Sequence, residues 1–252
     1  YEIDDASARL ARGAAIDAVT ALGVNRKDAT KLAESWIKTG DFLLSATLLP
    51  RADFVIGNPP YVRIEEIPGH TAGLYRATYK TMKGRADLYV GFFEAALRML
   101  KPDGVCAYIC ADRWMLNLYG AELRRFVTSG FDVSTIVEMH NAKAFDDDVS
   151  AYPAITIIKR KRQGTAVVAK IGDAALANTT RLLAPALLAA AKGETLPTPA
   201  ELTIAKVERW FSDSAPWPCS SPARLSLLRK IESQFELMDS AETATKVGIG
   251  VA

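Results

Sequence analysis

Two periodicities of hydrophobic residues alternate along the first two thirds of the chain. Apolar residues at helical spacing predict amphipathic helices over residues 5–22, 26–34, 87–100 and 121–128. Short apolar runs predict buried strands over residues 52–57, 105–111, 135–139, 152–158 and 165–171. Helices and strands that alternate in this way indicate an α/β fold built around a mostly parallel sheet.

The segments between these elements follow no single period. Residues 1–4 are predicted to end a strand, after which Asp5 is expected to cap the first helix. Residues 36–37 and 41–44 are predicted to form a short strand and its exit. Residues 62–85 are rich in Gly, Thr and charge, so we expect a long loop of the kind that often carries function.

The composition and the hydrophobic pattern of the sequence change near residue 172. Helices rich in Ala and Leu are predicted beyond Leu176, followed by a Pro- and Ser-rich stretch over 214–222 and an amphipathic helix over 223–235. We therefore expect one domain over residues 1–171 and the mostly helical start of a second over residues 172–252.

Composition narrows the class of protein. Hydrophobic residues make up 49% of the chain and charged residues 24%, which argues against a collagen-like, disordered or disulfide-scaffold protein. The longest apolar stretch, residues 182–191, is shorter than the roughly 18 residues of a membrane span, so no membrane segment is expected. Without a signal-peptide pattern at Tyr1, a cytoplasmic location is predicted. Cys106 and Cys110 lie on an apolar segment and are expected in the core, with no metal site.

Charge is unevenly distributed although the net charge is only +2. Residues 75–101 carry six basic side chains against two acidic ones, and residues 159–162 are all basic. A basic run is usually no more than a solvated surface, so a second feature has to indicate a phosphate backbone as the partner.

The sharpest signal is Asn58-Pro59-Pro60-Tyr61, directly after the strand predicted over residues 52–57. Proline lacks a backbone donor, so the strand has to stop there. Ligands of open α/β sheets bind outside the carboxyl ends of the strands, which is where these residues would lie. The plain alternative is a rigid strand exit that carries no chemistry.

These four residues suit an amino group on a planar ring. Such a nitrogen is a poor nucleophile because its lone pair is delocalised into the ring. The side-chain oxygen of Asn58 and the carbonyl of Pro59 can each accept one N–H and so localise the lone pair. The prolines hold that carbonyl without a competing donor, and Tyr61 offers a flat face on which the ring can stack.

The segment from Asp53 to Tyr61 resembles the catalytic motif of gamma-class N6-adenine DNA methyltransferases of type I and type IIG restriction-modification systems. The resemblance covers roughly residues 1–171. It implies a Rossmann-like S-adenosylmethionine-dependent methyltransferase sheet with helices on both faces, followed by the mostly helical start of a second domain. Residues 217–248 are similar to the start of the family's target recognition domain, which is expected to be cut short at Ala252.

The resemblance also implies roles for individual residues. Glu2 would bind the ribose hydroxyls of the cofactor, and Ile3 would lie beside its adenine. Asp41 would accept from the adenine amino group, Phe42 would contact the ring, and Asn58 would also touch the cofactor. Each of these has a structural alternative, since an acidic residue after a strand often caps a helix and an aromatic one often packs in the core.

For the substrate base, the resemblance implies that Tyr61 and Phe145 sandwich the flipped adenine. Tyr152 is the competing candidate for the position of Phe145. The aromatic pair would hold the base after its extrusion from the duplex.

The resemblance implies methyl transfer to adenine N6 in double-stranded DNA, within a restriction-modification or phage-defence system. A restriction endonuclease, a specificity subunit or a fused domain is the expected partner. Three alternatives remain open: methylation of a glutamine amide or of guanine N2 in RNA, a non-catalytic DNA-binding remnant, and a nuclease. In the family, a glycine-rich loop that binds the cofactor lies ahead of the motif that corresponds to residues 1–4. That loop is not among residues 1–252, so we expect these residues alone to bind the cofactor weakly.

Overall fold

A six-stranded sheet forms the centre of the computed structural model, which describes residues 1–140, 152–172, 176–208, 211, 213–217, 222–240 and 242–246. The strands are β1 (Ala52–Gly57), β2 (Leu100–Ala111), β3 (Asp132–Glu138), β4 (Pro153–Lys159), β5 (Ala166–Ile171) and β6 (Leu202–Val207). Their order in the sheet is β1-β2-β4-β3-β5-β6. The α/β fold predicted from the resemblance is confirmed.

The prediction of a mostly parallel sheet is wrong. Only β1–β2 and β3–β5 pair in parallel, while β2–β4, β4–β3 and β5–β6 are antiparallel. The cause is β4, which follows β3 in sequence but inserts between β2 and β3. The parallel pair β1–β2 still has the geometry that matters for the predicted site, because Gly57 at the end of β1 lies opposite Tyr108.

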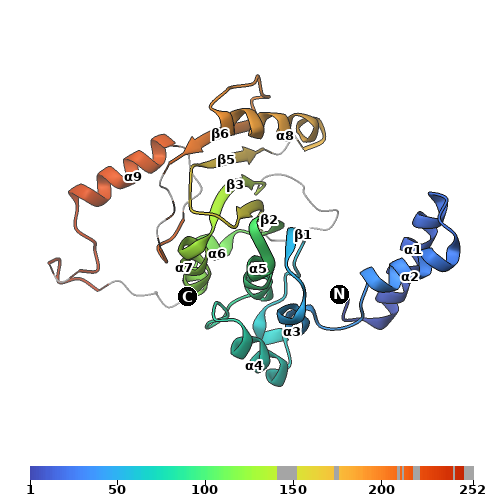
Figure 1. Cartoon of the computed structure of the whole chain (residues 1–252). Coiled ribbons are helices and arrows are strands. Elements are labelled where there is room, and N and C mark those ends of the chain that lie inside the picture. Colours follow the sequence, from blue (N-terminus) through green and yellow to red (C-terminus); the bar gives the residue numbers. More distant parts are fainter. Residues whose placement is uncertain are drawn as a thin grey trace.

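Helices cover both faces of the sheet (Figure 1). On one face, α5 (Leu88–Met99) and α7 (Ala121–Gly130) pack on the main core, which takes in Cys106 and Cys110 of β2. On the other face, α8 (Leu176–Lys192) packs on Ala169 and Ile171 of β5. Successive residues of a strand face opposite sides of its sheet, and Val168 accordingly belongs to the first core. Both cysteines are buried, as predicted.

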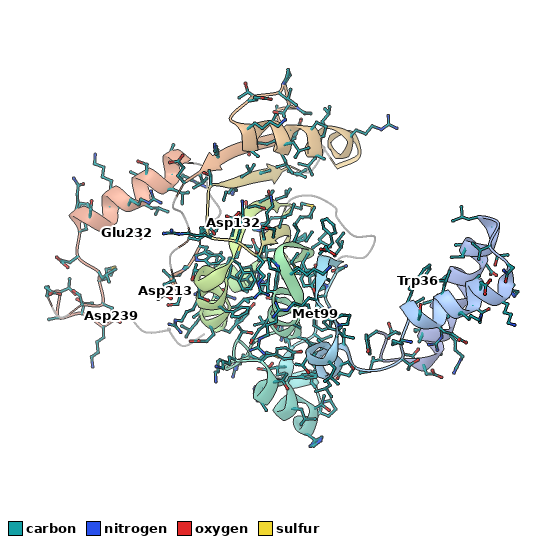
Figure 2. The ribbon with its side chains drawn as sticks, in the orientation of Figure 1. Trp36, Met99, Asp132, Asp213, Glu232 and Asp239 are labelled. Carbon is teal, nitrogen blue, oxygen red and sulfur yellow. The ribbon has the colours of Figure 1, made fainter. Side chains whose placement is uncertain are left out.

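The helix pair α1 (Asp5–Ala21) and α2 (Arg26–Trp36) extends to one side of the sheet. Figure 2 shows Trp36 on this pair and Glu232 on the far side of the molecule, with Met99 and Asp132 in the dense centre. The side chain of Asp4, and not that of Asp5, caps α1 by accepting from the Ser7 N–H at 2.7 Å. Trp36 ends α2, so the strand predicted over residues 36–37 does not form.

The segments between α2 and β3 contain further short helices. They are α3 (Phe42–Ser45), η1 (Ala46–Leu48), η2 (Ile64–Glu66), α4 (Gly69–Thr78), α6 (Arg113–Leu116) and η3 (Leu118–Gly120). The long loop predicted over residues 62–85 is therefore largely helical. Its buried side chains include Ala72, Tyr75 and Tyr79, which pack against Leu43 of α3 in a second core.

The sheet continues beyond residue 172. Strand β6 pairs with β5 along its whole length, from Leu202 opposite Ile171 to Val207 opposite Ala166. Helix α9 (Pro222–Gln234) follows, and Trp217 is buried in the main core. The division into domains at residue 172 stays a prediction. Within the described part of the chain, every helix is too short or too polar to cross a membrane.

Candidate cofactor and active site

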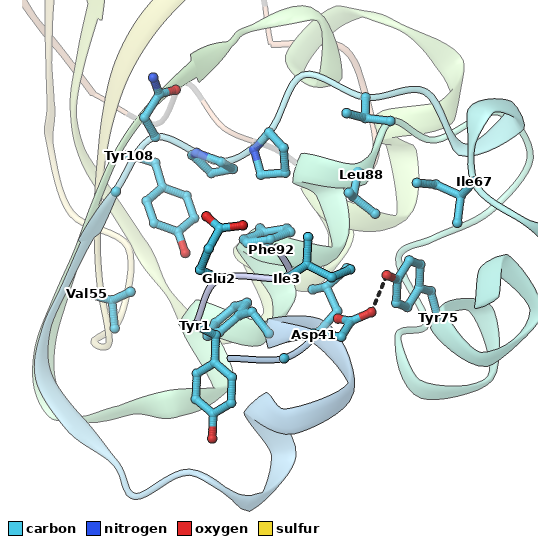
Figure 3. Close-up of a pocket in the computed structure, with 18 of the residues that line it drawn as sticks. Tyr1, Glu2, Ile3, Asp41, Val55, Ile67, Tyr75, Leu88, Phe92 and Tyr108 are labelled. Carbon is cyan, nitrogen blue, oxygen red and sulfur yellow. Dashed lines mark hydrogen bonds between the residues drawn. The ribbon is translucent and has the colours of Figure 1, made fainter. Parts of the chain in front are cut away.

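A cavity of about 630 Å³ lies at the carboxyl end of β1 (Figure 3). Three stretches far apart in the sequence meet there: residues 1–3, residues 40–43, and residues 55–60 with Val62. Seven of the residues singled out from the sequence line it: Glu2, Ile3, Asp41, Phe42, Asn58, Pro59 and Pro60. Helices α4 and α5 supply further wall residues. The structure therefore brings the expected cofactor residues and the catalytic motif to one place.

A short parallel bridge between Glu2 and Thr39 brings Glu2 next to the segment that carries Asp41, so both acidic residues lie on one wall of the cavity. The Glu2 N–H donates to the Lys38 carbonyl, and the Gly40 N–H donates to the Glu2 carbonyl, both at 2.9 Å. Gly40 has a φ of +144°, which favours glycine, and the Tyr1 ring approaches it closely. Figure 3 shows the Glu2 carboxylate directed into the cavity near Phe92 and Tyr108. Glu2 also accepts from the Asp4 N–H at 3.0 Å.

Asp41 caps helix α3 and also lines the cavity. Its Oδ1 accepts from the Leu44 N–H at 3.2 Å and so caps α3. Its Oδ2 accepts from the Tyr75 hydroxyl of α4 at 2.5 Å. Burial raises the pKa of Tyr75, and the hydrogen bond to Asp41 raises it further. The phenol therefore stays protonated and donates to the carboxylate throughout the neutral range.

Phe42 forms an aromatic wall with Phe92, a residue that the sequence analysis did not single out. The two rings are stacked with centroids 5.1 Å apart and planes 27° apart. Phe92 lies in the amphipathic helix predicted over residues 87–100 and is half-buried, in contact with both the main core and the second core. The adjacent Phe93 does face the core, where it packs on Trp114 and Tyr108. Neighbouring helix positions point about 100° apart, so Phe92 and Phe93 contact different surroundings, but the sequence carries no signal that separates the wall residue from the core residue.

The segment from Asn58 to Tyr61, predicted to be catalytic, follows the end of β1 at Gly57 as the sequence predicts. Asn58 is exposed at the cavity, and among the described residues no hydrogen bond occupies its side-chain amide. Pro59 is buried and Pro60 half-buried. Tyr61 lies outside the cavity lining and packs against the main core, 6.5 Å from the Tyr89 ring. Burial raises the pKa of the Tyr61 phenol.

Of the two candidates for the second stacking aromatic, the structure describes Tyr152, while Phe145 lies outside the described residues. Tyr152 directly precedes β4, with the His140 ring 4.9 Å away and the Arg113 guanidinium 5.0 Å over its face. These side chains line a second hollow, of about 280 Å³. The role of either residue stays a prediction.

Asp112 and Glu138 form a buried acidic group beside this hollow. Asp112 bonds to His140 at 2.6 Å, and Glu138 pairs with Lys170 at 2.5 Å. Burial raises the pKa of Asp112, and His140 opposes that shift. The ligand atoms of Asp112, Glu138 and His140 lie within 4.8 Å of one another, but side-chain partners already compensate both carboxylates.

The structure is an α/β domain with a cavity at the carboxyl end of β1. Residues 26–145, slightly less than half of the chain, match the family described as Eco57I restriction-modification methylase.

The chain is also similar to two methyltransferases of known name. The chain is 43% identical to the Type II methyltransferase M.PaeR7I of Pseudomonas aeruginosa, over 91% of this chain and 38% of the relative. It is 36% identical to the Type II methyltransferase M.XhoI of Xanthomonas vasicola, over 100% of this chain and 45% of the relative. The chain thus spans less than half the length of these relatives.

A solved structure supports the fold alone. A modification subunit of a putative type I restriction enzyme from Vibrio vulnificus YJ016 superposes with a TM-score of 0.54. The sequence identity is 13%, over 79% of this chain and 46% of that chain.

Proposed function

We propose that the protein transfers a methyl group from S-adenosylmethionine to N6 of adenine in double-stranded DNA, as part of a restriction-modification system in the cytoplasm. One observation carries the proposal: Asn58 and its two prolines stand at the same cavity as Glu2 and Asp41. An acceptor pair for an amino group thus lies next to an acidic and aromatic wall suited to a nucleoside.

The cavity fits the nucleoside part of that cofactor. Its volume is within the range of about 300–1,000 Å³ that is usual for small-molecule sites. Glu2 would accept from the ribose hydroxyls, Asp41 would accept from the adenine amino group, and the wall of Phe42 and Phe92 would contact the ring. Ile3 adds an apolar contact. When bound, the cofactor supplies an electrophilic methyl group.

Asn58 and Pro59 prepare the nucleophile. The amide oxygen of Asn58 and the carbonyl of Pro59 each accept one N–H of the target amino group, so that its lone pair is no longer shared with the ring. Asn58 is free to do this because no described hydrogen bond engages its side chain. Tyr61 and Phe145 would hold the extruded base by stacking.

Basic residues near the cavity favour a nucleic-acid substrate over a protein amide. Arg76, Lys80, Lys83 and Arg85 are all exposed on α4 and the turn that follows it. Both basic segments are partly engaged within the fold. Arg76 donates to the Gly84 carbonyl and Arg85 pairs with Glu65, while Arg160 donates to the Leu100 carbonyl and Lys161 pairs with Asp132. We assign the phosphate contacts chiefly to the α4 region because α4 lines the cavity.

The test is methylation by the natural full-length protein with radiolabelled S-adenosylmethionine and unmethylated duplex DNA. Hydrolysis and mass spectrometry should identify N6-methyladenine. Asn58→Ala should lower the rate about 10²–10³-fold while DNA affinity is retained, because one polar group at the transition state is lost. Asn25→Ala, which removes the cap of α2 far from the cavity, is the matched control. Label in RNA or protein, or cofactor binding without any methyl transfer, would contradict the proposal.

A further inference from the structure

The carboxylate of Asp41 is held at both of its oxygens. The Leu44 N–H binds Oδ1 at 3.2 Å, and the Tyr75 hydroxyl binds Oδ2 at 2.5 Å (Figure 3). Tyr75 is 3% exposed and lines the same cavity. It comes from α4, a segment that lies beyond the catalytic motif in sequence and is separated from Asp41 by 34 positions.

We infer that Tyr75 is a positioning residue, which fixes the Asp41 carboxylate so that it selects the amino group of the cofactor's adenine. This role rests on the proposed function. The last torsion of an aspartate side chain is intrinsically broad, so a single helix-capping bond leaves the carboxylate plane free to rotate. A second bond, at the other oxygen, fixes that plane and leaves the remaining lone pairs in a defined direction.

The Tyr75 hydroxyl is itself placed by rigid neighbours. Directly after α4, the hydroxyl of the buried Tyr79 donates to the Leu43 carbonyl at 2.5 Å. After the helix, the Thr81 N–H donates to the fully buried Glu94 at 2.8 Å. Helix α4 is thus fastened to α3 and α5 independently of Asp41, and the position of the Tyr75 oxygen does not depend on the bond that it makes.

The chemistry of the pair explains its selectivity. A phenol that donates to a carboxylate leaves that carboxylate ionised and able only to accept. An amino group on the purine ring can donate to it, whereas a ring carbonyl at the same position would place two acceptors face to face. A purine with hydrogen at this position would leave the carboxylate without its partner and lose the contact.

Calorimetry on the natural full-length protein tests the role with two ligands: S-adenosylhomocysteine, and its analogue with hydrogen in place of the adenine amino group. Tyr75→Phe should raise the Kd of S-adenosylhomocysteine about tenfold, since a hydrogen bond to a charged group is of that order. The Kd of the analogue should change by less than about twofold. Preference for the amino group should therefore largely disappear in Tyr75→Phe.

Tyr119→Phe is the matched control, because it removes a tyrosine hydroxyl that also donates to an aspartate, Asp87, at a place outside the cavity lining. It should lower the urea midpoint of unfolding and leave the ratio of the two Kd values unchanged. Equal weakening of both ligands by Tyr75→Phe would show a merely structural role and overturn the inference, as would an unchanged Kd for S-adenosylhomocysteine. Failure of the unmodified protein to bind S-adenosylhomocysteine would overturn the proposed function as well.

Discussion

Replacing Trp217 with alanine tests whether the segment after β6 is docked on the sheet domain. Trp217 is 1% exposed, and its ring packs edge-on against Trp114 at 5.3 Å and against Phe211 at 4.7 Å. Its backbone N–H donates to the Met115 carbonyl at 2.7 Å. Trp114 in turn contacts Phe93 of α5, so the aromatic cluster connects this segment to the helix that walls the cavity.

The expected cost is large. Truncation of a buried tryptophan to alanine costs about 3–5 kcal/mol, and the two aromatic contacts place this site in the upper half of that range. A domain is stable by only about 5–15 kcal/mol, so the variant should lose a large part of its stability. Trp217→Phe should cost much less, roughly 1 kcal/mol, because the indole N–H that it removes has no hydrogen-bond partner among the described residues.

Urea unfolding followed by circular dichroism measures both variants against the unmodified protein. The slope of the transition should be unchanged, and the midpoint should fall steeply for the alanine variant and slightly for phenylalanine. If Trp217→Ala unfolds at the same urea concentration as the unmodified protein, the segment is not docked in solution. A Phe variant as unstable as the Ala variant would mean that the indole N–H has a partner.

Three further predictions concern the two hollows. Phe92→Ala should weaken S-adenosylhomocysteine binding by about 1–3 kcal/mol in calorimetry, and an unchanged affinity would exclude Phe92 from the aromatic wall. Replacing Tyr61 or Phe145 by Trp should impair methylation less than replacement by Ala, because stacking is worth about 1–3 kcal/mol, and 2-aminopurine fluorescence at the target position should report the loss. His140→Ala should lower the free energy of unfolding by about 1–3 kcal/mol, and more at about pH 7 than at about pH 4. Burial raises the pKa of Asp112 in the folded state. Protonated Asp112 therefore stabilises the folded protein at low pH, and this stabilisation is lost as the pH rises through the pKa that Asp112 has in the folded state. Loss of His140 raises that pKa further, and an equal cost at both pH values would refute the coupling.

Elements that end at strong local signals could be predicted from the sequence. Strand β1 has the bounds expected for residues 52–57, because Pro59 and Pro60 leave no choice about where it stops. The pattern of α4 was also present, since Ala72, Tyr75 and Tyr79 lie three and four positions apart. It was obscured by Gly69 and Gly73, which are weak helix formers.

The direction and partners of strands could not be predicted in the same way. The apolar run of β4 looks the same whether the strand is parallel or antiparallel, so its insertion between β2 and β3 depends on the path of the chain. Strand β6 was missed because it is only partly buried, with polar residues such as Thr203 and Lys206.

Some residues of the cavity could be predicted from the sequence and others could not. Glu2, Asp41 and Asn58 stand in motifs whose sequence order suggests their neighbourhood, and the structure places them around one hollow. Phe92 and Tyr75 stand in helices whose apolar residues look like ordinary core. Their contacts with Phe42 and Asp41 depend on how α4 and α5 pack, which a single sequence does not contain.

The strand order also constrains the sequence of events during synthesis. Strand β1 is synthesised before β2, so the two can pair as soon as β2 has left the ribosome. Strand β3 pairs with β4 and β5, both of which are synthesised after it. Val133, Ile136 and Val137 must therefore wait unpaired until residues 153–171 emerge, while β2 waits for the same strand, β4. The centre of the sheet consequently forms late. Chaperones that bind exposed apolar strands would act on this protein after β3 has been synthesised and before β4 and β5 have emerged.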